Sequence, residues 1–303
     1  MTAEGRAMAA ARAGAVTPKK PVRRRYGTHA FMIAICVLWV FPLAWALYTS
    51  LRPYGDTARL GYVSIGGAYN LNNYANAWTR GEIPLHMFDT LLVVIPAMIL
   101  VLFFASMIAF AVSRYSFRFN LALLMLFTAG NLLPQQVVIV PLFRLYLALP
   151  LPHALNEFEL FYDSLIGIIA IHVAFQLGFC TFVLSNYFKQ VPKEINEAAV
   201  VDGASVWKTY WSVLLPLTRP ALAALATLEF TWIYNDFFWA LLLMRSGYKL
   251  PVTTSLNLLS GQFFTDNNLL AAASVIVALP TLIVFFALQK QFVSGLTLGS
   301  TKG

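Results

Sequence analysis

The chain has 303 residues, of which 59% are apolar and only 11% are charged, and its formal net charge is +8. Soluble domains carry about 25% charged residues, so this composition excludes an ordinary soluble globular protein. The mean hydropathy of +0.69 indicates a membrane protein. The basic residues are spread between apolar stretches rather than gathered on one soluble face, which argues against binding of nucleic acid.

Residues 1–25 are rich in Ala and Arg and end in a basic run, so they predict a disordered basic cytoplasmic tail. A cleaved signal peptide is the alternative, but its apolar region spans only about 7–15 residues. The apolar stretch that follows this tail is longer, which favours a retained first span. The basic run would anchor the topology and contact anionic membrane lipid.

Six apolar stretches are each long enough, at about 20 residues, to cross a bilayer as a helix. They cover residues 29–50, 88–112, 121–146, 162–186, 220–244 and 269–289. Since their apolar residues do not alternate, they favour helices over a β-barrel. The sequence therefore predicts an all-α membrane protein, with six transmembrane helices in one domain over residues 26–290 and a tail over 291–303.

The basic residues also predict the orientation of these spans. If the N-terminus is cytoplasmic, most of the 21 basic residues fall on the cytoplasmic side, as the positive-inside rule expects. The outside segments hold only Arg52, Arg59, Arg80, Arg144, Arg245 and Lys249. Both termini are therefore expected in the cytoplasm.

Polar side chains inside the third and fifth spans are candidates for a substrate path. Amides and carboxylates at membrane depth usually face protein or a cavity. Hydrogen bonding between helices explains the amides about equally well. Glu229 and Asp236 are about two helical turns apart, so one continuous helix would place both on one face. The candidates are Asn131, Gln135, Gln136, Glu229, Tyr234, Asn235 and Asp236.

Aromatic residues surround Asn235 and Asp236, at Trp232, Phe237, Phe238 and Trp239. Rings beside hydrogen-bonding groups suit a sugar, which has apolar faces and hydroxyl edges. An aromatic belt at the outer membrane surface is the alternative.

The polar segment 187–219 lies between the fourth and fifth spans and predicts two short helices. Glu194 suits the first turn of the first helix, and Gly203 suits the left-handed position that closes it. Ser205 can cap the second helix, which carries an apolar stripe. An amphipathic helix on the lipid surface is the alternative, but the first helix lacks the Lys and Arg typical of such helices. A docking surface for a partner is the favoured interpretation.

Metal and nucleotide chemistry have no clear motif in this chain. Cys36 and Cys180 lie within predicted spans without metal-type spacing, and His86, His153 and His172 lack a zinc motif such as His-Glu-x-x-His. A membrane-embedded enzyme is therefore the weaker interpretation. Because no phosphate-binding Gly-x-x-x-x-Gly-Lys-Ser/Thr loop occurs, ATP-driven work would need another chain.

Three motifs in and directly after segment 187–219 together resemble the coupling loop of ABC-importer permeases. They are Glu197-Ala198-Ala199, Asp202-Gly203-Ala204 and Pro216-Leu217 with Pro220. Other stretches resemble the carbohydrate, maltose-type branch, and in particular its shorter permease subunit: Leu133-Pro134-Gln135-Gln136, Asn235-Asp236-Phe237 and the residues from Gln291 to Thr297. The resemblance covers about residues 26–303, and it departs at Asp89-Thr90, where relatives commonly have Asn-Ser.

The resemblance implies a permease subunit of an ATP-driven carbohydrate importer in the bacterial cytoplasmic (inner) membrane. The chain would form half of the pathway, work by alternating access and perform no catalysis. Its partners would be a second, different permease subunit, two ATPase subunits that bind ATP and Mg, and an extracytoplasmic sugar-binding protein. No cofactor is expected in the chain itself.

The resemblance also implies roles for particular residues. Glu197, Ala198, Ala199, Asp202, Gly203 and Ala204 would couple to the ATPase, and Gly295, Lys302 and Gly303 would lie at its interface. An ion-coupled secondary transporter, with Glu229 and Asp236 as ion carriers, is the alternative function. Such transporters usually show repeated halves or broken helices, and the sequence pattern predicts neither.

Overall fold

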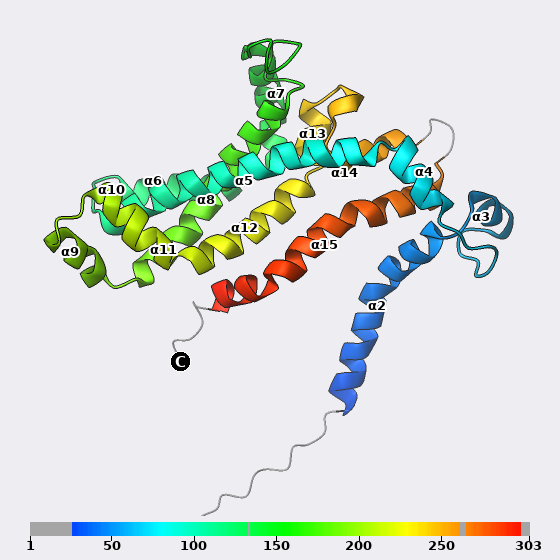
Figure 1. Ribbon diagram of the computed structural model, residues 1–303, viewed down its shortest axis with the longest axis horizontal. Helices are drawn as coiled ribbons and strands as arrows, with labels where there is room; N and C mark the ends of the chain where they lie inside the picture. The colour runs from blue at the N-terminus through cyan, green and yellow to red at the C-terminus, as the bar shows by residue number, and fades with distance from the viewer. Residues whose placement is uncertain (1–25, 133, 261–264, 298–303) are drawn as a thin grey trace, which may run out of the picture. The chain divides into compact units, whose positions relative to one another are not determined.

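The computed structural model describes residues 26–132, 134–260 and 265–297, so the tail 1–25, Lys302 and Gly303 lie outside the described residues. Apart from two isolated β-bridges, the regular structure of the described residues is helical (Figure 1), which confirms the all-helical prediction. The chain divides into two compact units, residues 1–45 and 46–303. In the first unit the structure describes the apolar start of helix α2 (Tyr26–Ser50).

Four helices of the described residues are each long and apolar enough to cross a membrane without a break. They are α2, α5 (Ile83–Arg114), α8 (Leu165–Gln190) and α15 (Asn267–Thr297). The last of these continues through Thr297, so the tail predicted from residue 291 begins as a helix.

The predicted third and fifth spans are each interrupted in the structure. The third contains α6 (Asn120–Leu132), the 3-10 turn η1 (Gln135–Val138) and α7 (Ile139–Ala148). Its segments Ala122–Gly130 and Gln135–Ala148 meet at 92°. Pro134, just before the second segment, has no amide hydrogen to continue a helix.

The fifth predicted span contains α12 (Arg219–Tyr234) and α13 (Phe238–Leu243), with a break at residues 235–237. A second bend of 74° separates Val206–Leu217 from Arg219–Tyr234. If each bent pair forms one span, the described residues hold up to six spans.

Helices α5 and α8 pack against each other and form the centre of the second unit, and α12 packs against α15. Ala97, Val101, Ala105 and Ala109 recur at every fourth position of α5 and are fully buried. On α8, Cys180, Leu184 and Phe188 repeat the same spacing and belong to one core cluster with the last three of these α5 residues. Small side chains let two helices approach closely, which explains the tight contact.

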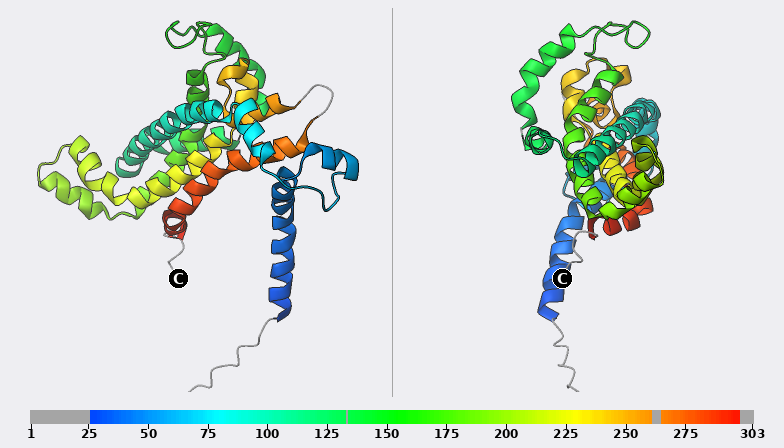
Figure 2. Two further views of the ribbon diagram at one scale, coloured as in Figure 1. Left: turned by 45° about the vertical axis from the view of Figure 1, so that its right-hand side comes forward. Right: turned by 90° about the vertical axis from the view of Figure 1, so that its left-hand side faces the viewer.

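Short helices connect the long ones. Before α5 lie α3 (Tyr54–Leu60) and α4 (Asn72–Arg80), and before α15 lie η3 (Gly247–Lys249), α14 (Val252–Ser255) and η4 (Leu256–Leu259). After α8 come α9 (Lys193–Val201), α10 (Val206–Lys208), the π-helix η2 (Thr209–Leu214) and α11 (Leu215–Leu217). Figure 1 and the left view of Figure 2 place α9 and α4 at opposite ends of α5.

Candidate functional site

The break between α12 and α13 opens onto a cavity of about 520 Å³. Its lining combines amides, one imidazole, one carboxylate and five aromatic rings. The lining residues are Gln135, His172, Phe175, Gln176, Trp232, Asn235, Asp236, Phe237, Phe238 and Trp239. Among the described residues that line it, Asp236 is the only carboxylate, and Lys and Arg are absent.

Asp236 creates the local structure of this break. Its Oδ1 accepts a hydrogen bond from the amide of Trp239 at 3.2 Å, and its Oδ2 accepts one from the amide of Ala240 at 3.1 Å. A carboxylate at a helix start satisfies free amides and suits the helix dipole. Asp236 therefore lies just before α13 and satisfies the free amides of its first turn, at the point where the predicted fifth span is interrupted.

Helix α8 supplies the opposite wall of the cavity. His172 and Gln176 are one turn apart on it, so they lie on one face together with Phe175. The Nε2 atom of His172 is buried, has no hydrogen-bond partner and lies 3.6 Å from the Oδ2 atom of Asp236. The cavity thus has an available imidazole nitrogen next to its only described carboxylate.

The structure divides the predicted substrate-path residues. Gln135, Asn235 and Asp236 come together in the cavity, whereas Gln136 is exposed and does not line it. The side chain of Asn131 lies outside the described residues.

Glu229 and Tyr234 have another role in this structure, because both side chains pack between helices. The thiol of Cys180 donates a hydrogen bond to Oε1 of Glu229 at 3.1 Å, and the hydroxyl of Tyr234 donates one to the carbonyl of Val277 at 3.0 Å. The prediction that Glu229 and Asp236 share one helical face was wrong, because α12 ends at Tyr234.

Sequence reasoning missed His172, Phe175 and Gln176 as parts of the cavity. His172 was considered only as a packing or metal-ligating residue. Its spacing to Gln176 was the available signal, since a second polar residue one turn away marks a polar face on an apolar helix.

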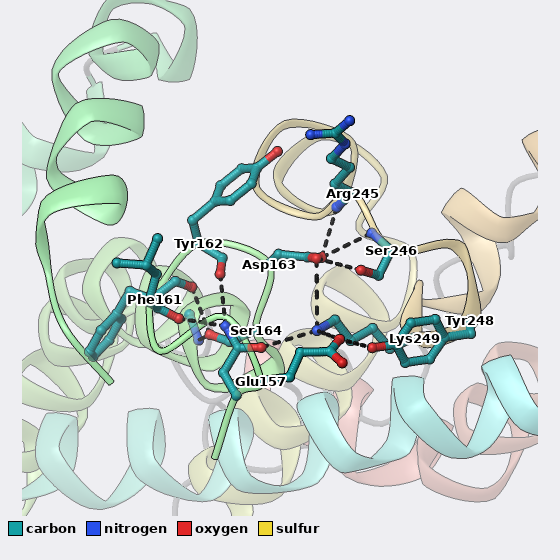
Figure 3. A network of polar contacts seen from close by, with 12 residues as sticks. Glu157, Phe161, Tyr162, Asp163, Ser164, Arg245, Ser246, Tyr248 and Lys249 are labelled. Atoms are coloured by element: carbon teal, nitrogen blue, oxygen red, sulfur yellow. Dashed lines mark hydrogen bonds and ion pairs between the residues drawn. The ribbon is translucent and has the colours of Figure 1, made fainter. Parts of the chain in front are cut away.

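A polar bracket outside the spans holds α13 in place (Figure 3). Asp163 precedes α8 and accepts hydrogen bonds from the amides of Arg245 and Ser246 at 2.8 and 3.1 Å and from the hydroxyl of Ser246 at 2.5 Å. Its own amide donates to the carbonyl of Leu243, the last residue of α13, at 2.8 Å. The bracket ties the start of α8 to the end of α13, which carries part of the cavity wall.

Lys249 completes this bracket. Its Nζ atom lies 3.8 Å from Asp163 Oδ2, 3.5 Å from Glu157 Oε1 and 3.1 Å from Asn156 Oδ1. Burial alone would raise the pKa of Asp163, but the Ser246 hydroxyl, the two amides and Lys249 outweigh burial and lower this pKa. The hydroxyl of Tyr248 donates to Glu157, which lowers the pKa of Glu157 and raises that of Tyr248.

At the other end of the unit, residues 192–218 form a second candidate site, the coupling segment. Helix α9 ends at Val201, and Gly203 two residues later has a φ of 76°, in the left-handed region predicted for it. The hydroxyl of Ser205 accepts a hydrogen bond from the amide of Lys208 at 3.3 Å, which confirms the predicted cap. Two short helices joined by an Asp-Gly turn therefore project here, as Figure 1 shows at α9 and α10.

The coupling segment exposes only part of its predicted partner-facing set. Glu197, Ala198, Asp202 and Gly203 are exposed, and Ala204 is half-buried. Ala199 is buried, and its carbonyl accepts a hydrogen bond from the amide of Ala204 at 2.9 Å. Ala199 therefore packs within the chain rather than on the exposed face.

Comparison with known proteins shows the family. A family model described as binding-protein-dependent transport system inner membrane component matches residues 102–297. A probable ABC transporter permease of Pyrococcus horikoshii is 34% identical over 91% of this chain and 97% of its own length. The diacetylchitobiose uptake system permease NgcG of Streptomyces coelicolor is 30% identical over 90% of this chain and 87% of its own.

Solved structures share the fold. A chain of a bacterial ABC transporter that imports the acidic polysaccharide alginate matches with a TM-score of 0.71 at 18% identity, covering 96% of this chain and 99% of that chain. The chain therefore belongs to the family of binding-protein-dependent transport system inner membrane components, and it is the permease of an ABC importer rather than the subunit that hydrolyses ATP.

Proposed function

We propose that this permease carries a carbohydrate and forms half of the translocation pathway. The cavity at the α12–α13 break is the observation that supports this substrate class. It combines amides, an imidazole and a carboxylate with five aromatic rings. Such a lining can stack on the apolar faces of a sugar ring and hydrogen-bond its hydroxyl edges.

The relatives support the same substrate class. The permease of Streptomyces coelicolor belongs to a diacetylchitobiose uptake system, and a permease of Bacillus subtilis that is 28% identical belongs to an arabinooligosaccharide transport system. Carbohydrate is the substrate class that these two systems share.

The exposed face of the coupling segment supports docking of an ATPase. Glu197 and Asp202 offer charge to a basic partner, and Ala198 lets a partner's backbone approach closely. We propose that two ATPase subunits bind ATP and Mg and that one of them receives this face. A second, different permease would complete the pathway, and an extracytoplasmic sugar-binding protein would deliver the substrate.

In this proposal the spans lie in the inner membrane with both chain ends in the cytoplasm. Closure of the ATPase subunits moves the coupling segment, and the spans alternate between outward and inward access to the cavity. The segment at Gly295, Lys302 and Gly303 would lie near the ATPase.

The test begins with purification of the tagged chain and its companions from native membranes. Mass spectrometry should find a protein with a phosphate-binding loop, a second permease and a sugar-binding protein. In proteoliposomes this complex should take up one of the two sugars named for these relatives, diacetylchitobiose or arabinooligosaccharide, only when ATP and Mg are present at the ATPase side.

Two matched variants test whether uptake depends on residues that line the cavity. Asn235→Ala removes a lining amide and should lower uptake while leaving ATPase assembly intact, because Asn235 lines the cavity and lies outside the coupling segment. Its Nδ2 atom donates to the Thr231 carbonyl one turn back at 2.7 Å and to the Thr281 hydroxyl of α15 at 3.4 Å. Gln136→Ala removes an exposed amide outside the lining and serves as the control. Equal uptake by both variants would contradict the proposed path, and uptake by this chain alone without ATP would support an ion-coupled carrier.

A further inference from the structure

Helix α5 is hydrogen-bonded to the residues just before the coupling segment and to Tyr210 in its second half. The entry end is held by Arg114, the last residue of α5. Its Nη2 atom donates to the carbonyl of Phe188 at 2.8 Å and to the carbonyl of Val191 at 3.1 Å. These carbonyls belong to the last turn of α8 and to the residue before Pro192, so one guanidinium fixes the point where the chain leaves the bundle.

The second half of the segment is held by Ser106, about two turns earlier on α5. Its hydroxyl donates to the carbonyl of Phe103 at 2.9 Å and lies 2.7 Å from the hydroxyl of Tyr210. Because Ser106 has a single hydroxyl hydrogen, Tyr210 is the donor in the bond between the two. Ser106 and Tyr210 are both 2% exposed, so water does not compete for this bond.

Aromatic packing also holds Tyr210 against α5, in addition to its hydrogen bond with Ser106; we call the contacts of Arg114 and of Tyr210 the two anchors of the segment. Its ring lies 5.3 Å from the ring of Phe110 on α5, and 5.8 and 5.2 Å from the rings of Trp207 and Trp211, measured between centroids. Tyr210 lies in η2, a stretch of π-helix, and π-helical turns occur frequently at functional sites. The second half of the coupling segment is therefore joined to α5 by a polar bond within an aromatic cluster.

Helix α5 also reaches the cavity end of the unit. The amide of Val252 on α14 donates to the hydroxyl of Thr90 of α5 at 2.8 Å, and the hydroxyl of Thr253 donates to the carbonyl of Asp236. A displacement of α5 along its axis would therefore reach Asp236, whose side chain satisfies the free amides at the start of α13.

We propose that α5 is the element that transmits movement of the coupling segment to the cavity, and that Arg114 and Tyr210 are positioning residues for this transmission. The inference rests on the proposed ATPase docking and goes beyond it, because it assigns the route within this chain. Loss of either anchor leaves the docking face intact but lets the segment move without α5.

The experiment measures the movement itself and needs no identified substrate. Asn235→Cys is introduced into a chain in which Cys36 is replaced by Ser, and the complex with its companions is purified. The rate at which a small maleimide labels position 235 is measured with and without a non-hydrolysable ATP analogue and Mg. In the complex that carries Asn235→Cys and no change at Arg114, Ser106 or Tyr210, the labelling rate should change clearly when the nucleotide is added.

Tyr210→Phe removes one hydroxyl and keeps the ring. It should reduce the nucleotide-dependent change by about fivefold, the factor that corresponds to ~1 kcal/mol for one hydrogen bond. Ser106→Ala should have the same effect, and the double variant should be no worse than either single one. Arg114→Met should also reduce the change, and Arg114→Lys, which keeps a donor, should restore part of it.

Tyr146→Phe is the matched control. Tyr146 is also buried, and its hydroxyl donates to the carbonyl of Gly167 at 2.8 Å, away from the coupling segment. It should leave the nucleotide response unchanged, and all variants should retain ATP hydrolysis and companion binding. A normal response in Tyr210→Phe, or equal losses in Tyr210→Phe and Tyr146→Phe, would overturn the inference. If the parent complex itself shows no nucleotide response, the proposed function fails instead.

Discussion

Asp163 shows how a single residue can determine the position of a neighbouring element. Its φ of 56° lies in the left-handed region, which Asp and Asn tolerate better than other residues with a side chain. In this conformation its carboxylate accepts hydrogen bonds from two backbone amides and one hydroxyl group of the residues that follow α13. Loss of its charge would weaken the attachment of α13 and therefore the wall of the cavity.

The pH dependence of stability should follow from this carboxylate. Its folded-state pKa is lowered, so its contribution is present above the unfolded-state pKa, which is near the ordinary value of 3.8. As the pH falls through the lower folded-state pKa, this contribution is lost. The melting temperature in detergent should therefore decline below about pH 4 more steeply in the parent chain than in Asp163→Asn.

Asn is a suitable replacement in this comparison because it also tolerates positive φ and still accepts amide hydrogen bonds. At pH 7 the variant should melt at a lower temperature than the parent. Parallel pH curves for the two proteins would show that the carboxylate of Asp163 has no special role.

Glu229 leads to a different prediction, because its side chain is fully buried and its Oε2 atom has no hydrogen-bond partner. The thiol of Cys180 is the one donor seen at its Oε1 atom. Glu229→Gln keeps the shape and an acceptor for this thiol, so uptake should remain close to that of the parent and stability should change by no more than about 1 kcal/mol. Abolished uptake in a folded, ATPase-competent Glu229→Gln complex would instead favour ion coupling through this residue.

Residues with strong local preferences could be predicted from the sequence. Gly203 closes a helix and Ser205 caps the next, because each requirement is met within a few residues of the chain. The cavity partner of Asp236 could not be predicted in this way, since His172 lies on another helix and only tertiary packing brings the two together. Glu229 was misplaced for a related reason, because a strictly helical spacing was extended past Tyr234.

At the level of elements, apolar length predicted where the helices lie but not where they break. An apolar stretch reports compatibility with lipid, whereas a break depends on which groups replace the lost backbone hydrogen bonds. At residues 235–237 the side chain of Asp236 replaces the lost backbone hydrogen bonds. The apolar sequence alone did not reveal this role, so the stretch was interpreted as one continuous span. Pro134 offered a visible signal for the other break, since proline removes a donor.

Substitutions at Gly203, in the turn of the coupling segment, can distinguish two effects. One is backbone strain within this chain, and the other is loss of contact with the ATPase. At Gly203 an added Cβ would meet nothing within 4 Å, but the positive φ penalises any side chain. Gly203→Ala should therefore lower stability by about 1–2 kcal/mol. Gly203→Trp should lower stability by a similar amount and in addition weaken binding of the ATPase and uncouple ATP hydrolysis from uptake.

Gly203→Asn is the control, because Asn adopts left-handed backbone conformations more readily. Melting temperatures of the isolated chain and affinity for the purified ATPase would be measured for all three variants. Normal ATPase affinity and normal uptake in Gly203→Trp would contradict docking at this turn.

For the second unit as a whole, the two ends of α5 carry different kinds of structure. The end at Arg114 carries the coupling segment, while the end at Ile83 adjoins α4 and the loop that precedes it. The positive-inside rule assigns the first end to the cytoplasm. If the unit spans the inner membrane as proposed, the two ends face different compartments.

Single cysteines can test this orientation, in a chain whose Cys36 and Cys180 are replaced by Ala. Val201→Cys lies on the coupling segment and Val63→Cys lies between α3 and α4, and the parent side chains are 86% and 85% exposed. A membrane-impermeant maleimide should label Val63→Cys in intact cells stripped of their outer layers, and Val201→Cys only in inside-out vesicles. Because the two positions are matched in exposure, a difference in labelling reports the compartment and not the burial. Labelling of both from the same side would contradict the orientation and, with it, access of a cytoplasmic ATPase to the coupling segment.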